Sequence, residues 1–220
     1  MIKVKKDAIK YKTSNGMQNS GVICQIGTFG VDYASSASII QFNANSELPP
    51  KVTLNLNNVT SLGELMNGVT NVEELTINLK KQCTTMYRMI FAFSANKFKK
   101  IVLNFDTSKV TSMMNAFCRI TTQGAEIIGE LDFSSVTVIS GMFDYSSGIK
   151  EVRFKKGTLK LSLQMRDLAL LSDESIQSII DGLADLTGQT AQTVQFHSDV
   201  KSKLTENQIA QITSKNWTLA

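Results

Sequence analysis

The sequence predicts an α/β repeat protein, a solenoid in which short strands form one face and short helices form the other. Two observations lead to this fold. Four eight-residue segments share the same apolar columns, and an apolar-x-apolar triplet precedes each of them. Self-similarity at a short interval is typical of repeat architectures. A strand and a helix within so few residues cannot enclose a core alone, whereas stacked neighbours can.

The four segments, octets 1 to 4, are VTSLGELM, CTTMYRMI, VTSMMNAF and VTVISGMF, at residues 59–66, 83–90, 110–117 and 136–143. Apolar residues fill columns 1, 4, 7 and 8, a spacing that predicts one face of a short helix. Threonine fills column 2 of every octet, where its hydroxyl can cap the N–H groups of a helix start. The methionines fall mostly in the apolar columns, so we expect them in the core rather than on a binding surface.

The triplets predict short strands with one side in the core, because their apolar residues alternate with period two. Their starts lie 21, 26, 30, 21 and 42 residues apart. Most of these intervals lie near the roughly 20–29 residues of leucine-rich repeats, so we expect a leucine-rich-repeat solenoid over residues 49–165. The polar run DTSK before octet 3 is then a strand-to-helix turn. The triplets start at Leu54, Leu75, Ile101, Leu131, Val152 and Val194.

Residues 1–48 lack the repeat columns and predict a small β-hairpin unit. Alternating segments flank Ser14-Asn15-Gly16, a strong hairpin signal. Because the ends of a solenoid need covering, we favour a cap over the first repeat. Attachment of the chain to a larger assembly stays open as the alternative.

Residues 166–220 predict a longer strand–helix repeat that closes the solenoid. Ser172 and the two acids after it begin a helix with an apolar stripe, and Gly188 is expected to end it. Thr205 and Gln208 have capping-box spacing for a second helix. Trp217 is expected to pack over the end of this unit.

Composition narrows the functional classes. The chain of 220 residues has a net charge of +4 and a single histidine, His197, so a classical zinc site or a Ser-His pair is not expected. Cys24, Cys83 and Cys118 lack CxxC spacing, which favours buried free thiols. No segment has the pattern of a signal peptide or membrane helix. We expect no cofactor, no metal and no membrane insertion. The location is left open, and the chain is expected in the cytoplasm before any assembly onto a virion or cell surface.

Signals for catalysis are weak. GELMNGVT, residues 63–70, has the glycine spacing of a phosphate-binding loop, but Val69 replaces the lysine that would reach the phosphates. Acidic pairs such as Glu73-Glu74 show no convergence on a pocket with a shifted pKa. We therefore expect a non-enzymatic protein.

FDTSKVTSMMNAF, residues 105–117, and SSVTVISGMF, residues 134–143, resemble the repeat of BspA-type leucine-rich-repeat proteins, F-D-T-S-x-V-T-x-M-x-x-M-F. The first two repeats are less similar. The ending, LADLTGQTAQTV and KLTENQIAQITSKNWTLA, resembles the closing module of many such bacterial proteins. The resemblance implies an adhesin-like recognition protein of a bacterium or prophage. Because neither a signal peptide nor an anchor is recognised, a prophage tail-associated or injected-structure component is favoured over a surface-anchored protein.

The outward side of the strands is the predicted binding surface. An extended polar ladder suits a protein or glycan partner, which many modest hydrogen bonds can hold. Nucleic acid is not expected, because the ladder mixes acids with bases and lacks stacking aromatics. The alternative is that this face is only solvated and that residues 1–48 attach the chain as an architectural part of a phage tail or similar assembly. The oligomeric state is not predicted. The candidate residues are Asn55, Asn57, Thr76, Asn78, Lys100, Asn104, Glu130, Asp132, Arg153 and Lys155.

Overall fold

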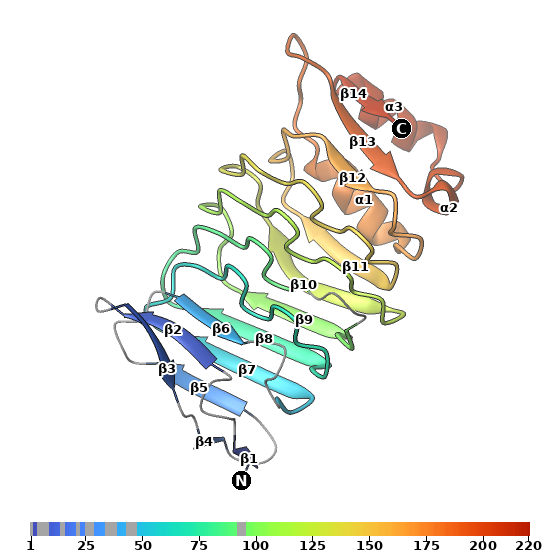
Figure 1. Cartoon of the computed structure of the whole chain (residues 1–220). Coiled ribbons are helices and arrows are strands. Elements are labelled where there is room, and N and C mark those ends of the chain that lie inside the picture. Colours follow the sequence, from blue (N-terminus) through green and yellow to red (C-terminus); the bar gives the residue numbers. More distant parts are fainter. Residues whose placement is uncertain are drawn as a thin grey trace.

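A parallel β-sheet runs through most of the chain in the computed structural model (Figure 1). The structure describes residues 41–42, 48–91 and 96–220 in full, and the backbone alone of residues 2–3, 9–13, 16–20, 23–24, 29–33 and 39–40. In chain order the elements are β1 (Ile2–Lys3), β2 (Ile9–Thr13), β3 (Gly16–Ser20), β4 (Ile23–Cys24), β5 (Phe29–Tyr33), β6 (Ile39–Phe42), β7 (Lys51–Leu56), β8 (Glu74–Leu79), β9 (Lys100–Asn104), β10 (Ala125–Leu131), β11 (Ile149–Phe154), β12 (Leu163–Met165), α1 (Asp173–Gly182), β13 (Gln192–Phe196), α2 (Ser198–Lys201), α3 (Glu206–Ser214) and β14 (Trp217–Leu219).

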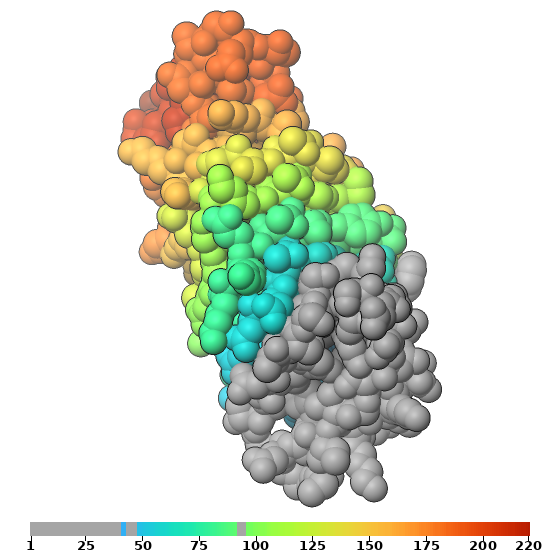
Figure 2. Space-filling model, turned by 90° about the vertical axis from the view of Figure 1, so that its left-hand side faces the viewer, coloured from blue at the N-terminus to red at the C-terminus, as the bar shows by residue number. Residues whose placement is uncertain are grey.

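The main sheet has six strands in the order β11-β10-β9-β8-β7-β5, and every neighbouring pair is parallel. From β7 to β11 the spatial order follows the chain, so each strand lies beside the strand of the next repeat. Figure 2 shows the same succession as bands of colour along the molecule. Among the described strands the sheet is open, with β5 and β11 at its edges. The fold is therefore of the α/β type, with a parallel sheet and few short helices.

Strands β7, β8, β9 and β11 form where the triplets predict them. In β7 the inward Val52, Leu54 and Leu56 are at most 2% exposed, whereas the residues between them face outward. The alternation arises because successive side chains of a strand point to opposite faces. The inward rows of neighbouring strands pack together into one continuous hydrophobic core.

The fourth strand begins earlier than predicted. The triplet from Leu131 to Phe133 was expected at its centre, but β10 ends at Leu131 and pairs with β9 through Ile127 opposite Ile101. A register shift interrupts the pairing of β10 with β11. Gly129 lies within this irregular stretch with φ of +121°, and a Cβ there would lie 2.7 Å from the carbonyl oxygen of Leu103. Glycine is therefore required at this close approach of two backbones.

The octets are not helices, which corrects the prediction. None of their residues is helical, and the column 7 N–H donates to the column 4 carbonyl of the same octet at 3.0–3.2 Å, as in a β-turn. Column 6, the third residue of each turn, has a left-handed φ between 49° and 64°. A single left-handed residue ends any right-handed helix. The column 6 residues are Glu64, Arg88, Asn115 and Gly141.

Hydrogen bonds to the next repeat replace the helical bonds of the octets. In octet 3, Met113 N–H donates to Val138 O at 2.8 Å, and Asn115 N–H donates to Ser140 O at 3.1 Å. The predicted inward columns are nevertheless confirmed, because all sixteen residues in columns 1, 4, 7 and 8 are at most 8% exposed. Turns and helices both bring every third or fourth residue to one side, so the spacing alone does not distinguish them.

The column 2 threonines join successive octets rather than capping helices. Thr84 donates to the carbonyl oxygen of Thr60 through its backbone N–H at 2.8 Å and through its hydroxyl at 3.0 Å. Thr111 and Thr137 repeat this pair of bonds with the preceding threonine. The invariance of column 2 therefore reflects a ladder between repeats, since no helix start exists there.

The polar run DTSK is a turn, as predicted, although it leads into another turn. Asp106 accepts hydrogen bonds from the N–H and the hydroxyl of Ser108, at 2.9 and 2.6 Å. Such Asx turns fix the chain direction locally. The arrangement recurs in Asp132 with Ser134 and in Asp185 with Thr187.

The predicted N-terminal hairpin is present as β2 and β3, which pair antiparallel up to Thr13 opposite Gly16. Ser14 and Asn15 of the predicted turn lie outside the described residues. Strand β6 adds to β2, giving a three-stranded sheet separate from the main one. At its end, Phe42 N–H donates to Leu65 O at 2.7 Å, which joins this sheet to octet 1.

The C-terminal part contains the helices. Ser172 caps α1 as predicted by accepting from Ser175 N–H at 3.1 Å, but α1 ends at Gly182 and not at Gly188. It ends there because Leu183 takes an extended conformation and bridges to Leu159. The capping box of α3 is confirmed.

A second parallel sheet, β12-β13-β14, forms within this C-terminal part. Strand β13 was predicted, whereas β12 and β14 were not. Trp217 belongs to β14 and is buried, and its indole N–H donates to Ala184 O at 2.9 Å.

Candidate functional site: the outer face of the parallel sheet

The outer face of the main sheet carries most of the predicted binding residues in rows across the strands. Thr53 of β7, Thr76 of β8 and Val102 of β9 lie opposite one another. Asn57 lies just beyond the end of β7 and is half-buried. Because neighbouring strands are about 4.8 Å apart, each row presents side chains at a regular spacing.

Three of the predicted residues form an asparagine ladder, Asn55–Asn78–Asn104. The Asn78 side-chain amide donates to Asn55 Oδ1 at 2.6 Å, and that of Asn104 donates to Asn78 Oδ1 at 2.7 Å. A primary amide has two donor hydrogens and two acceptor lone pairs, and the ladder uses only one of each between neighbours. The remaining hydrogen-bonding capacity faces outward, most openly at the exposed Asn104.

A row of alternating charge lies at the start of the strands, separated from the ladder by the row of Thr53, Thr76 and Val102. Lys51, Glu74, Lys100 and Glu126 occupy successive strands in register. Lys51 Nζ lies 2.7 Å from Glu74 Oε1. The side chains of Lys51 and Glu74 are 64% and 42% exposed, so their ion pair adds little to stability, and its charges can instead interact with a partner.

Asp132 does not face outward as predicted. It is 4% exposed, and Oδ1 accepts from the N–H and the hydroxyl of Ser134 at 2.8 and 2.5 Å. Its Oδ2 lies 3.0 Å from Lys155 Nζ. Burial opposes ionisation, but the hydrogen bonds from Ser134 and the nearby Lys155 together lower the pKa of Asp132. The same contact raises the pKa of Lys155. Asp132 and Lys155 therefore stabilise a turn. Lys155 is exposed, as is Glu130, whereas Asp132 is buried.

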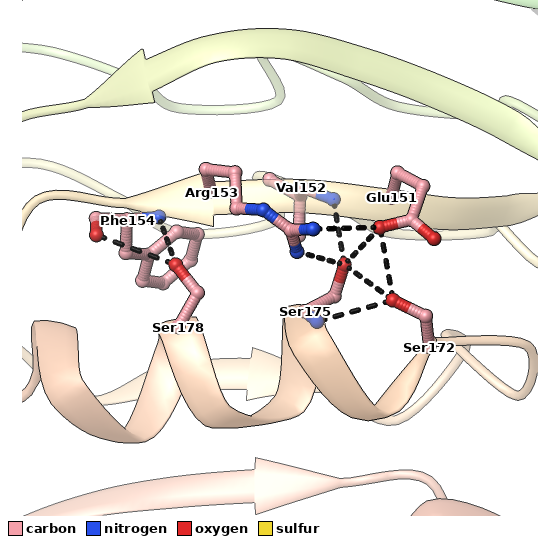
Figure 3. Close-up of polar contacts among 7 residues, drawn as sticks. All are labelled: Glu151, Val152, Arg153, Phe154, Ser172, Ser175 and Ser178. Carbon is pink, nitrogen blue, oxygen red and sulfur yellow. Dashed lines mark hydrogen bonds and ion pairs between the residues drawn. The ribbon is translucent and has the colours of Figure 1, made fainter.

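Arg153 is engaged by the helix that covers the edge of the sheet (Figure 3). Its guanidinium lies 3.3 Å from Glu151 and donates to Ser175 Oγ at 3.0 Å. Ser175 Oγ also accepts from Val152 N–H at 3.1 Å, and Ser178 Oγ accepts from Phe154 N–H at 3.0 Å.

Figure 3 shows both serines on the side of α1 that faces β11, one helical turn apart. Their hydroxyls take the place of carbonyl groups from a seventh strand, so the edge of β11 is closed. The sequence did not reveal this role, although a serine pair at i, i+3 beside the apolar stripe of α1 was its signal. The accessible part of the predicted binding site therefore consists of the outward residues of β7–β9 together with Glu130 near the end of β10.

Sequence reasoning also missed a cluster of arginines stacked on aromatic rings on the turn side. The Arg88 guanidinium lies 5.1 and 4.9 Å from the ring centres of Tyr87 and Phe91. That of Arg119 lies 4.7 Å from the Tyr145 ring. Such contacts stabilise the surface of the octets.

Neither a metal cluster nor a reactive thiol is found in the described part of the chain. No group of three or more potential ligands comes together there. Cys83 and Cys118 are buried free thiols, as predicted, and burial raises the pKa of each to about 11. The side chain of Cys24 lies outside the described residues. Within those same described residues, the helices are too short and too polar to span a bilayer.

Comparison with known proteins gives one match. A family model described as "Mycoplasma protein of unknown function, DUF285" matches residues 84–154, from octet 2 to the end of β11. Neither the curated proteins nor the solved structures that were compared contain a match.

Proposed function

We propose that the chain is a non-enzymatic recognition protein that binds a protein or glycan through the outer face of its parallel sheet. In this proposal the repeats form a leucine-rich-repeat solenoid of the BspA type, encoded by a bacterium or prophage. The observation that carries the proposal is the asparagine ladder, a rigid line of amides with unused donors and acceptors on the same face as a row of alternating charge.

Rigidity is the physical advantage of this surface. The backbone of β7–β9 is held on both sides by neighbouring strands, so the side chains lose little freedom on binding. Amides that both donate and accept can pair with the hydroxyls of a glycan or with polar groups of a protein. The extended arrangement favours many modest contacts over one deep pocket.

The test compares two triple variants. The outer-face variant places bulk and positive charge on the sheet through Thr76→Arg, Asn78→Arg and Asn104→Arg. The control variant adds the same charge at exposed positions outside the sheet through Gln82→Arg, Gln123→Arg and Ser147→Arg. Labelled parent and variants are applied to intact bacterial cells and a glycan array, after circular dichroism confirms equal folding.

We expect saturable binding by the parent and the control, and at least a tenfold weaker signal from the outer-face variant. Equal binding by all three proteins would place the contact elsewhere. If the parent binds nothing, the second candidate is an architectural component attached through residues 1–48.

One observation bears on that second candidate. Strand β5 extends the main sheet beside β7, and Phe42 N–H donates to octet 1 as the column 8 residue of a preceding repeat would. This arrangement supports a cap at the start of the repeats. A cap and an attachment unit are compatible, and dissociation of oligomers upon deletion of residues 1–20 would favour attachment.

A further inference from the structure

A groove of about 370 Å³ opens on the turn side of the repeats, away from the outer face of the sheet. One wall is residues 137–141 of octet 4. The other wall is formed by Leu161, Ser162 and Gln164, at the start of β12. All of the lining residues are uncharged, and Val138 is 38% exposed there.

The preceding octets show what normally lies against this wall. In octet 2, Met86 N–H and Arg88 N–H donate to Ser112 O and Met114 O of octet 3, both at 2.9 Å. Octets 1 and 3 make the same two bonds from columns 4 and 6 to the octet that follows. The column 2 carbonyl in turn accepts from the N–H of the next threonine. Each octet is therefore paired with a backbone segment on its C-terminal side.

Octet 4 lacks this neighbour. Within the described residues, the N–H groups of Ile139 and Gly141 have no acceptor, and the carbonyl of Thr137 has no donor. Four residues beyond Gly141, Asp167 Oδ2 accepts from Tyr145 N–H at 2.6 Å, where the equivalent Arg119 after octet 3 donates to a backbone carbonyl. A side chain thus satisfies the ladder at Tyr145, whereas the backbone groups in the groove stay open.

The opposite wall also presents a free backbone edge. Strand β12 pairs with β13 on one side and with no other described strand. A segment of chain in the groove can therefore form hydrogen bonds on at least one side and pack on apolar side chains, as in β-strand addition.

We propose that this groove binds an uncharged, extended peptide segment of a partner protein, whose backbone completes the ladder at octet 4. Its carbonyls accept from Ile139 and Gly141, and one of its N–H groups donates to Thr137. Apolar side chains of the peptide lie against Val138 and Leu161. This site is independent of the binding proposed for the sheet.

The test uses a fluorescein-labelled octapeptide, VTVISGMF, which copies residues 136–143. In the protein this segment presents Val138 O and Ser140 O to octet 3 and donates Thr137 N–H to Thr111 O at 2.8 Å. It can present the same groups to octet 4. The control peptide carries an N-methyl group on its threonine, which removes the donor and keeps every side chain.

Fluorescence anisotropy gives the affinity, and NMR hydrogen exchange reports on the Ile139 and Gly141 amides. We expect saturable binding, at least tenfold protection of both amides, and at least tenfold weaker binding of the methylated peptide. The protein variant Val138→Glu should also bind the unmodified octapeptide at least tenfold more weakly. Gln82→Glu, which changes an exposed residue two repeats away, should not weaken binding.

Three outcomes would overturn the proposal: no saturation at millimolar peptide, unchanged affinity in Val138→Glu, or protection of other amides only. If the chain sediments as a dimer with both amides already protected, the occupant is a second copy and the proposal is also wrong. The outer-face variant should bind the octapeptide like the parent, so failure of one site does not imply failure of the other.

Discussion

Octet 3 and helix α1 have similar apolar spacing but different backbones. Val110, Met113 and Phe117 lie at i, i+3 and i+7 and are buried, as are Ile176, Ile179 and Leu183. Octet 3 is a turn whose N–H groups pair with octet 4, whereas α1 is a ten-residue helix that satisfies its own backbone.

Their lengths and their neighbours explain the difference. A helix needs several turns to offset the cost of its nucleus, and eight residues with Asn115 at φ of 53° do not provide them. A parallel neighbour on each side offers partners for the same N–H groups. Helix α1 follows the last strand of the main sheet, and its ten residues include no left-handed position, so its backbone pairs internally. Apolar spacing therefore predicts which residues are buried. It does not predict whether the backbone forms a turn or a helix, which depends on the length of the segment and on its hydrogen-bonding neighbours.

The largest effect should come from charge in the buried columns. Met113→Asp should destabilise the fold by about 3–5 kcal/mol, because an unpaired carboxylate would enter a fully buried site. Ile179→Asp should cost a similar amount, which would show that turn and helix bury equivalent columns. Urea denaturation measures both. Met114→Asp, at a half-buried position, is the control. If Met113→Asp were as stable as the parent, the inward columns would be misassigned.

The contact of α1 with β11 should have the next largest effect. Ser175→Ala leaves the Val152 N–H without an acceptor and should cost about 1–3 kcal/mol. Ser214→Ala removes a hydroxyl that bonds within α3 at the surface, and its effect should stay within about 0.5 kcal/mol. Equal losses in denaturation experiments would show that the edge of β11 is not closed by the serine.

Glycine substitution distinguishes turn from helix directly. Glu174→Gly in the first turn of α1 should cost about 1 kcal/mol, because glycine is a poor helix former and the substitution removes an acid that favours the helix N-terminus. Asn115→Gly should be neutral or slightly stabilising, since glycine adopts a left-handed φ without steric strain. Thermal unfolding of the two variants tests this contrast. A loss of about 1 kcal/mol in both would indicate that octet 3 is helical.

The smallest expected effect on stability comes from the residues that precede octet 4 and α1. Asp132 begins the turn before octet 4, and its folded pKa is lowered, whereas Ser172 caps α1 without titrating. A carboxyl group whose pKa is lower in the folded state stabilises the fold at pH values above its unfolded pKa of about 3.9. This stabilisation is lost as the pH falls through the folded pKa. Asp132→Asn should therefore be less stable than the parent at pH 7, and the difference should vanish near pH 2. A difference independent of pH would exclude the carboxylate as its cause.

The sequence by itself determined which residues are buried and where the repeats lie. The triplets at β7, β8, β9 and β11 and the columns of all four octets were identified correctly, because hydrophobic burial requires a fixed period. It also determined the starts of α1 and α3, since Ser172 and Thr205 cap their helices through bonds a few residues away. Patterns that lie within a single helix, strand or turn can therefore be recognised from one sequence.

Only the tertiary structure decided how the octets satisfy their backbone and which outward residues are free. The left-handed residues at Glu64 and Arg88 carry no local signal, because bonds to the next repeat impose their conformation. Asp132 was predicted to face outward, but it is buried by its turn and its ion pair with Lys155. Arg153 donates a hydrogen bond to Ser175 of α1. Apart from the local turn of Asp132 with Ser134, hydrogen bonds and an ion pair between residues more than 20 positions apart decide these outcomes, and a local pattern does not contain them.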